Sequence, residues 1–88
     1  MDRWEKGMLA RSLAGHDKNK VYLIFDMDET YVYLIDGELR TKENPKKKKR
    51  IHTQIIKEKY QIDMADDVKV KRILKEYKMS KAGLKEEL

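Results

Sequence analysis

The sequence predicts a mostly β domain, folded as a small barrel, followed by one C-terminal helix. Short runs of β-branched and aromatic residues alternate with turn residues through the first two thirds of the chain. Apolar residues recur at helical spacing in the last third. With 88 residues, of which 42% are charged, the chain can bury only a small core and has little sequence left to cover an open sheet. We therefore expect the strands to close on themselves.

Three strands are predicted in the first half of the chain, at residues 8–12, 21–25 and 31–35. Residues 14–19, between the first two, have turn chemistry. Strand alternation gives residues 21–25 one core face, made by Val21, Leu23 and Phe25. Three tyrosines are expected opposite the core, where they cover neighbouring side chains or stack on unpaired bases: Tyr22, Tyr31 and Tyr33. Trp4 precedes the barrel and is expected to plug its open end.

The dipeptide Asp36-Gly37 predicts a tight hairpin turn that returns the chain through a strand at residues 38–41. Residues 51–53 have room for one last short strand. The segment 54–63 is compatible with strand, helix or linker.

A helix is predicted over residues 67–79, with Asp66 or Asp67 as its N-terminal cap. Its apolar face, which is expected to dock on the barrel or on a partner, contains Val70, Ile73, Leu74 and Tyr77. The expected organisation is a barrel over residues 1–60 and a helical extension over residues 61–88.

Residues 40–50 (RTKENPKKKKR), which we call the basic strip, carry a larger net positive charge than the whole chain. Their net charge is +6, whereas that of the whole chain is +5, so the remaining residues sum to −1. Such a concentration predicts a polyanionic partner. The cations of the strip are Arg40, Lys42, Lys46, Lys47, Lys48, Lys49 and Arg50. The alternative is a solvated loop without a partner.

Nucleic acid is the favoured polyanion, because phosphate neutralisation releases counterions whatever the base sequence. A membrane partner is not expected, since the chain has no cysteine for lipid attachment and no apolar run long enough to span a bilayer. The absence of cysteine also excludes disulfides and thiol chemistry. We expect a cytoplasmic location and no cofactor.

Residues 7–20 (GMLARSLAGHDKNK), followed by the apolar run 21–25, resemble a KOW motif. With residues 31–50, the resemblance extends over about 7–52 and narrows to small bacterial KOW-domain RNA-binding proteins related to large-subunit ribosomal proteins of archaea and eukaryotes. It implies an SH3-like barrel and ribosome-associated RNA binding. Asn19 stands where many members have glycine, and asparagine tolerates the left-handed conformation. The other motif and turn residues are Gly7, Gly15, Asp36 and Gly37.

The expected function is binding of structured RNA, most plausibly ribosomal RNA, through the basic strip and the loop 14–20. If Lys46 to Arg50 each neutralise a phosphate, affinity falls with salt at a log-log slope of roughly −3.5 to −4.5. Outside the strip, we expect RNA contacts from Arg11, His16, Lys18, Lys20 and His52. Backbone amides of the turn flanked by Lys18 and Lys20 are further candidates to face a phosphate.

Two other functions compete with RNA binding. One is a protein-interaction adaptor of the transcription or translation machinery, whose helix face docks into a partner groove. The other is a phosphatase, because Asp26-Met27-Asp28-Glu29-Thr30 resembles the first motif of haloacid-dehalogenase-type enzymes. That resemblance implies Asp26 as nucleophile and Asp28 as acid and base, with magnesium and with Asp66 and Asp67 as distal ligands. Chain length disfavours it, because no crossover helix fits between residues 30 and 66. We therefore expect no enzymatic activity.

Overall fold

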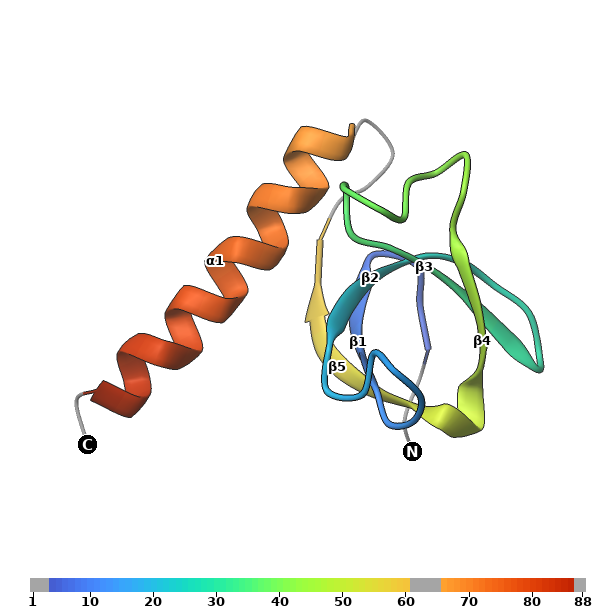
Figure 1. Cartoon of the computed structure of the whole chain (residues 1–88), viewed down its shortest axis with the longest axis horizontal. Coiled ribbons are helices and arrows are strands. Elements are labelled where there is room, and N and C mark those ends of the chain that lie inside the picture. Colours follow the sequence, from blue (N-terminus) through green and yellow to red (C-terminus); the bar gives the residue numbers. More distant parts are fainter. Residues whose placement is uncertain (1–3, 61–65, 87–88) are drawn as a thin grey trace.

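The computed structural model describes residues 4–60 and 66–86. Within these residues, five strands form one antiparallel sheet, and a single α-helix follows it (Figure 1). The elements are β1 (Met8–Ser12), β2 (Val21–Met27), β3 (Tyr31–Ile35), β4 (Lys46–Lys49), the 3₁₀ turn η1 (Arg50–His52), β5 (Thr53–Lys59) and α1 (Asp67–Glu86).

The strand order is β4-β3-β2-β1-β5, so the first and last strands of the chain pair with each other. The sheet curls around its own axis, and η1 connects its two edge strands, β4 and β5 (Figure 1). This is a small SH3-like barrel followed by a helix. The predicted fold class is confirmed.

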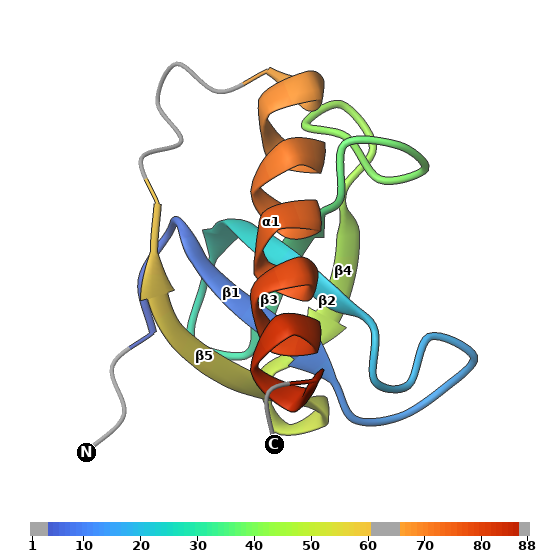
Figure 2. The same cartoon turned by 90° about the vertical axis from the view of Figure 1, so that its left-hand side faces the viewer.

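Both faces of the central strands are buried, in two separate cores. The inner core fills the barrel and contains Met8, Ala10, Tyr22, Ile24, Val32 and Leu34, with Trp4 packed against it. The outer core lies between the sheet and α1 and contains Leu9, Val21, Leu23, Ile35, Val70, Ile73, Leu74 and Tyr77. Figure 2 shows α1 crossing the front of the strands. The helix therefore docks on the barrel of its own chain.

The prediction of one core face on β2 is incomplete. Val21, Leu23 and Phe25 do share a face, which packs under the helix. The opposite face is the barrel interior, and placing Tyr22 among the exposed tyrosines was wrong, because only 3% of its surface is accessible. A strand that separates two cores is apolar on both sides, so alternation does not tell which side is outside.

The predicted Asp36-Gly37 hairpin was also wrong, because β3 pairs with β4 and not with residues 38–41. Residues 36–45 form a longer loop between these strands. The Asp36 carboxylate closes its first turn by accepting hydrogen bonds from the backbone N–H groups of Glu38 (2.8 Å) and Arg40 (2.9 Å). Local side-chain capping of this kind competes with strand pairing and ends β3 at Ile35.

Gly37 lies against the first turn of α1. Its φ is +82°, and a Cβ atom there would collide with the carbonyl oxygen of Asp67 and lie 2.9 Å from the amide nitrogen of Lys71. Glycine is thus required both by the backbone conformation and by the close approach of the helix.

Three other predicted boundaries change. Residues 50–52 form η1, so the predicted strand at 51–53 begins only at Thr53 and continues to Lys59. Residues 54–59, left open by the sequence, are therefore strand, while 61–63 lie outside the described residues. The helix extends past Met79 to Glu86, because the added residues are mostly good helix formers.

Asp66 caps α1, as predicted, since its Oδ1 accepts a hydrogen bond from the Lys69 N–H (2.9 Å). Among the described residues, no helix is long and apolar enough to cross a membrane.

Replacement of Gly37 by alanine is expected to destabilise the protein more than replacement of Gly15. Both residues have positive φ, which costs alanine roughly 1–2 kcal/mol. At Gly15 the new methyl group has room, with its nearest neighbour at 3.6 Å, whereas at Gly37 it strikes helix backbone. Urea unfolding of G37A and G15A measures the difference, and equal losses would contradict the close docking of α1 on the loop.

Candidate functional site

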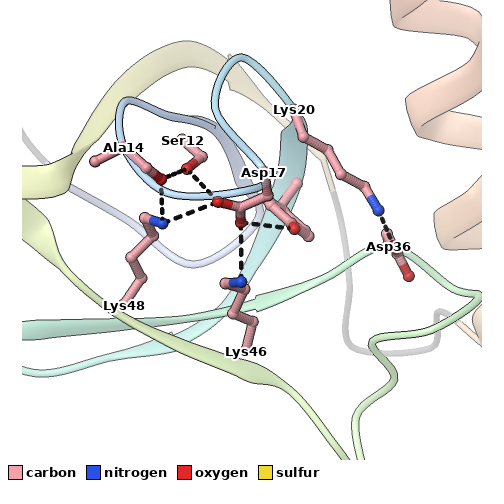
Figure 3. Close-up of polar contacts among 8 residues, drawn as sticks. Ser12, Ala14, Asp17, Lys20, Asp36, Lys46 and Lys48 are labelled. Carbon is pink, nitrogen blue, oxygen red and sulfur yellow. Dashed lines mark hydrogen bonds and ion pairs between the residues drawn. The ribbon is translucent and has the colours of Figure 1, made fainter.

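The carboxylate of Asp17 lies at one end of the barrel and accepts hydrogen bonds from four side chains. Ser12 Oγ (2.8 Å) and Lys48 Nζ (3.0 Å) bind Oδ1, while Tyr22 OH (2.9 Å) and Lys46 Nζ (3.1 Å) bind Oδ2. Lys48 also donates to the carbonyl oxygen of Ala14 (2.8 Å). Figure 3 shows Lys46 and Lys48 converging on Asp17 from β4. We call these residues the Asp17 cluster.

The Asp17 cluster is charged and largely shielded from water, since only 11% of the Asp17 side chain and 12% of the Lys48 side chain are accessible. Burial alone would raise the pKa of Asp17. The hydrogen bonds from Lys48, Ser12, Tyr22 and Lys46 outweigh it and hold this pKa well below its ordinary value. Burial and the bond to Asp17 raise the pKa of Tyr22. The carboxylate is therefore ionised in the folded protein at any pH near neutrality.

The run of four lysines is β4 itself, and its alternation divides the run between two faces. Lys46 and Lys48 pair in register with Leu34 and Val32, whose side chains belong to the inner core. Their side chains extend to the barrel end, where the ammonium groups form ion pairs with Asp17. Two of the cations predicted to bind RNA are thus held in ion pairs within the protein.

Lys47 and Lys49 lie on the opposite, exposed face of β4, in register with Tyr33 and Tyr31. We call these four residues the outer β3–β4 face. The Nζ of Lys47 lies 4.2 Å from the centre of the Tyr31 ring. Tyr31 and Tyr33 are half-buried there, as predicted for tyrosines opposite the core. Each of these two lysines therefore lies beside an aromatic residue of the neighbouring strand.

The loop 14–20 turns back on itself and uses its own backbone amides. The N–H groups of Lys18, Asn19 and Lys20 donate to carbonyl oxygens of Gly15, Ser12 and Asp17, respectively. They are not directed at a phosphate, so that part of the prediction was wrong. Asn19 has a φ of +76°, which confirms the left-handed conformation expected of it.

The side chains of this loop differ in availability. His16 and Lys18 are exposed, whereas Lys20 forms an ion pair with the Asp36 carboxylate (2.7 Å). Burial alone would raise the pKa of Asp36, but the Lys20 ammonium and the backbone N–H groups of Arg40 and Glu38 lower it.

The loop 14–20 and the basic strip meet at a shallow depression of about 310 Å³. Its lining combines residues predicted separately, His16 and Lys20 from the loop and Arg40 and Lys46 from the strip, and also includes Asp17. Segments at least twenty residues apart are thus brought together, as the RNA-binding hypothesis requires.

The remaining predicted residues are scattered. Arg11 is half-buried on β1, and Lys42 lies 6.0 Å from the Phe25 ring centre. The Arg50 guanidinium lies 5.6 Å from the ring centre of Trp4, which packs against the inner core as the expected plug. His52 is exposed in η1. None of these four lines the depression between the loop and the strip.

Asp26 and Asp28, the residues of the phosphatase-like motif, lie at the hairpin between antiparallel β2 and β3. Asp28 Oδ1 accepts hydrogen bonds from the N–H groups of Thr30 (2.8 Å) and Tyr31 (2.7 Å), which lower its pKa. Asp26 forms an ion pair with Lys6 (3.3 Å). Both are exposed, as the competing interpretation predicted, but only Asp28 is a turn residue, because Asp26 lies within β2 and pairs with Tyr33. Residues 4–60 and 66–86 contain no group of three potential metal ligands.

The adaptor hypothesis required a free apolar face on the helix. Val70, Ile73, Leu74 and Tyr77 are instead buried in the outer core. These four residues are therefore unavailable to a partner while the helix is docked.

Sequence reasoning did not find the role of Asp17, Ser12 or Tyr22. A serine and an aspartate near a glycine indicate a turn, and nothing local indicates that the Asp17 carboxylate meets lysines about thirty residues away. Comparison with known proteins adds no assignment: no protein-family model matches the chain, and no curated protein matches it.

Replacement of Asp17 by asparagine is expected to lower the free energy of unfolding by about 2–4 kcal/mol at neutral pH, because Lys46 and Lys48 lose their counter-charge. Glu43→Gln, which neutralises an exposed carboxylate in the 36–45 loop, serves as control and should change stability little. Urea unfolding measures both.

The difference in the free energy of unfolding between the wild-type protein and D17N should depend on pH. The folded pKa of Asp17 lies below the unfolded value of about 3.9, so its stabilisation is complete above that value and is lost as the pH falls through it toward the folded pKa. The stability gap between wild type and D17N should therefore close in acid. A gap that stays constant to well below pH 4 would show that the Asp17 charge is not what stabilises the barrel end.

Proposed function

We propose that the protein is an RNA-binding module that contacts the phosphate backbone of structured RNA, with ribosomal RNA the leading candidate. The single observation that carries the proposal is the outer β3–β4 face. There, Lys47 and Lys49 are exposed on a strand whose inner lysines are fixed by Asp17. Cations held on a rigid strand lose less conformational entropy on binding than cations of a free tail.

Three further features support RNA over other polyanions. Tyr31 and Tyr33 adjoin Lys47 and Lys49, a combination that suits unpaired bases beside a phosphate backbone. The loop 14–20 adds exposed His16 and Lys18 at the barrel end. The KOW resemblance of residues 7–52 implies the same barrel and the same partner. Recognition would depend on shape and backbone, because an A-form helix hides its base edges in a narrow groove.

The division of β4 changes the expected salt dependence. Only Lys47 and Lys49 of its four lysines are available to phosphates without breaking a bond to Asp17. The strip alone should therefore contribute a slope smaller in magnitude than the value of roughly −3.5 to −4.5 expected for five contacts.

Replacement of Lys47 and Lys49 by glutamine should weaken binding to a labelled RNA stem-loop by at least about tenfold and reduce the magnitude of the salt slope by about 1.4–1.8. Fluorescence anisotropy across a salt series measures both quantities. The control K69Q/R72Q removes two exposed cations from α1 and should have a small effect. Co-sedimentation with large ribosomal subunits, lost in K47Q/K49Q, tests the ribosomal destination. A wild-type slope near zero would rule out the electrostatic mechanism.

A further inference from the structure

The two exposed flanks of α1 differ in charge. With about 100° of rotation per residue, the buried face of Val70, Ile73, Leu74 and Tyr77 separates them. One flank presents Lys71, Lys75 and Lys78, with Asp67 one turn before Lys71 as the acidic residue of its first turn. The other flank mixes signs, since Asp66 and Glu76 accompany Lys69 and Arg72 around a separate depression. We call the first one the lysine flank.

The lysine flank forms one wall of a groove of about 310 Å³ between the helix and the sheet. The opposite wall comes from the barrel and contains Lys20, Asp36 and Glu38, while Val21 and Leu74 form the apolar floor. The groove is therefore lined by charged side chains from both the helix and the sheet.

The charges of this groove do not cancel. Asp36 is paired with Lys20 (2.7 Å) and Glu38 with Lys71 (2.8 Å), so each carboxylate already has a cation. Lys75 and Lys78 are exposed and, among the side chains that the structure describes, pair with no carboxylate. Two positive charges remain, three residues apart on one helix face, where neighbouring side chains lie about 5–6 Å from each other.

The groove continues the predicted RNA-binding surface. Lys20 lines both this groove and the depression that contains His16, Arg40 and Lys46. Figure 3 shows Lys20 extending from the barrel end toward Asp36, which lies beside the helix. Residues of the basic strip, the loop 14–20 and the lysine flank thus line two depressions that share Lys20.

We propose that the groove between α1 and the 36–40 turn is a second binding site for the RNA backbone, with Lys75 and Lys78 contacting neighbouring phosphates. The proposal rests on the RNA-binding function proposed above and extends it to the helix. The Lys20–Asp36 and Lys71–Glu38 ion pairs position the two walls, and the exposed pair supplies the attraction. The helix then has two roles: its apolar face completes the outer core, and its lysine flank enlarges the phosphate footprint.

The test compares two double variants of the same helix. K75Q/K78Q removes two cations from the lysine flank, and K69Q/R72Q removes two from the opposite flank, so the change in net charge is identical. Binding of a labelled RNA stem-loop is measured by fluorescence anisotropy across a salt series. K75Q/K78Q should reduce the magnitude of the salt slope by about 1.4–1.8, and K69Q/R72Q by clearly less. Combination with K47Q/K49Q should give an additive reduction.

The outcomes separate the two proposals. If K75Q/K78Q and K69Q/R72Q behave alike while K47Q/K49Q still weakens binding, the helix site is refuted and the RNA-binding function stands. If the wild-type protein binds the stem-loop without salt dependence, both proposals fail. Circular dichroism and urea unfolding of each variant confirm that the exposed substitutions leave the fold intact.

Discussion

The buried carboxylate of Asp17 determines how the end of the barrel is built. The alternation of β4 directs Lys46 and Lys48 toward an apolar interior, where an unpaired ammonium group would be very costly. Asp17 removes this cost by binding both lysines, and Ser12 and Tyr22 complete its shell. The same carboxylate links the loop 14–20 to β4. A strand of four consecutive lysines is stable here because two of them are bound to Asp17 within the fold.

This compensation also determines which surface remains for a partner. With Lys46 and Lys48 directed inward, Lys47 and Lys49 are held outward beside Tyr31 and Tyr33, in an arrangement set by strand register. The excess of positive charge that the sequence shows as one run is distributed over the structure. Part of it stabilises the barrel, part forms the outer β3–β4 face, and a further part lies on the lysine flank of α1. The proposed RNA surface is accordingly wider than the basic strip and uses fewer of its residues.

The sequence predicted the elements whose pattern is local. The strands at 8–12, 21–25 and 31–35 and the buried face of the helix follow from alternation and helical spacing. Features that depend on distant partners were not predictable. Asp36-Gly37 reads as a hairpin, but Gly37 is needed for contact with a helix thirty residues later. Four identical lysines contain no periodicity, so the division of β4 into two faces is invisible until its pairing with β3 is known.

The central claim is that β4 is a two-faced strand whose inner lysines are held by Asp17. Amine-reactive footprinting of the free protein, read by mass spectrometry at each lysine, tests it without any ligand. The account predicts rapid modification of Lys47 and Lys49 and slow modification of Lys46 and Lys48, with the contrast lost in D17N. Equal reactivity of all four lysines in the wild-type protein would mean that the basic run is a uniformly solvated segment, and the account would be wrong.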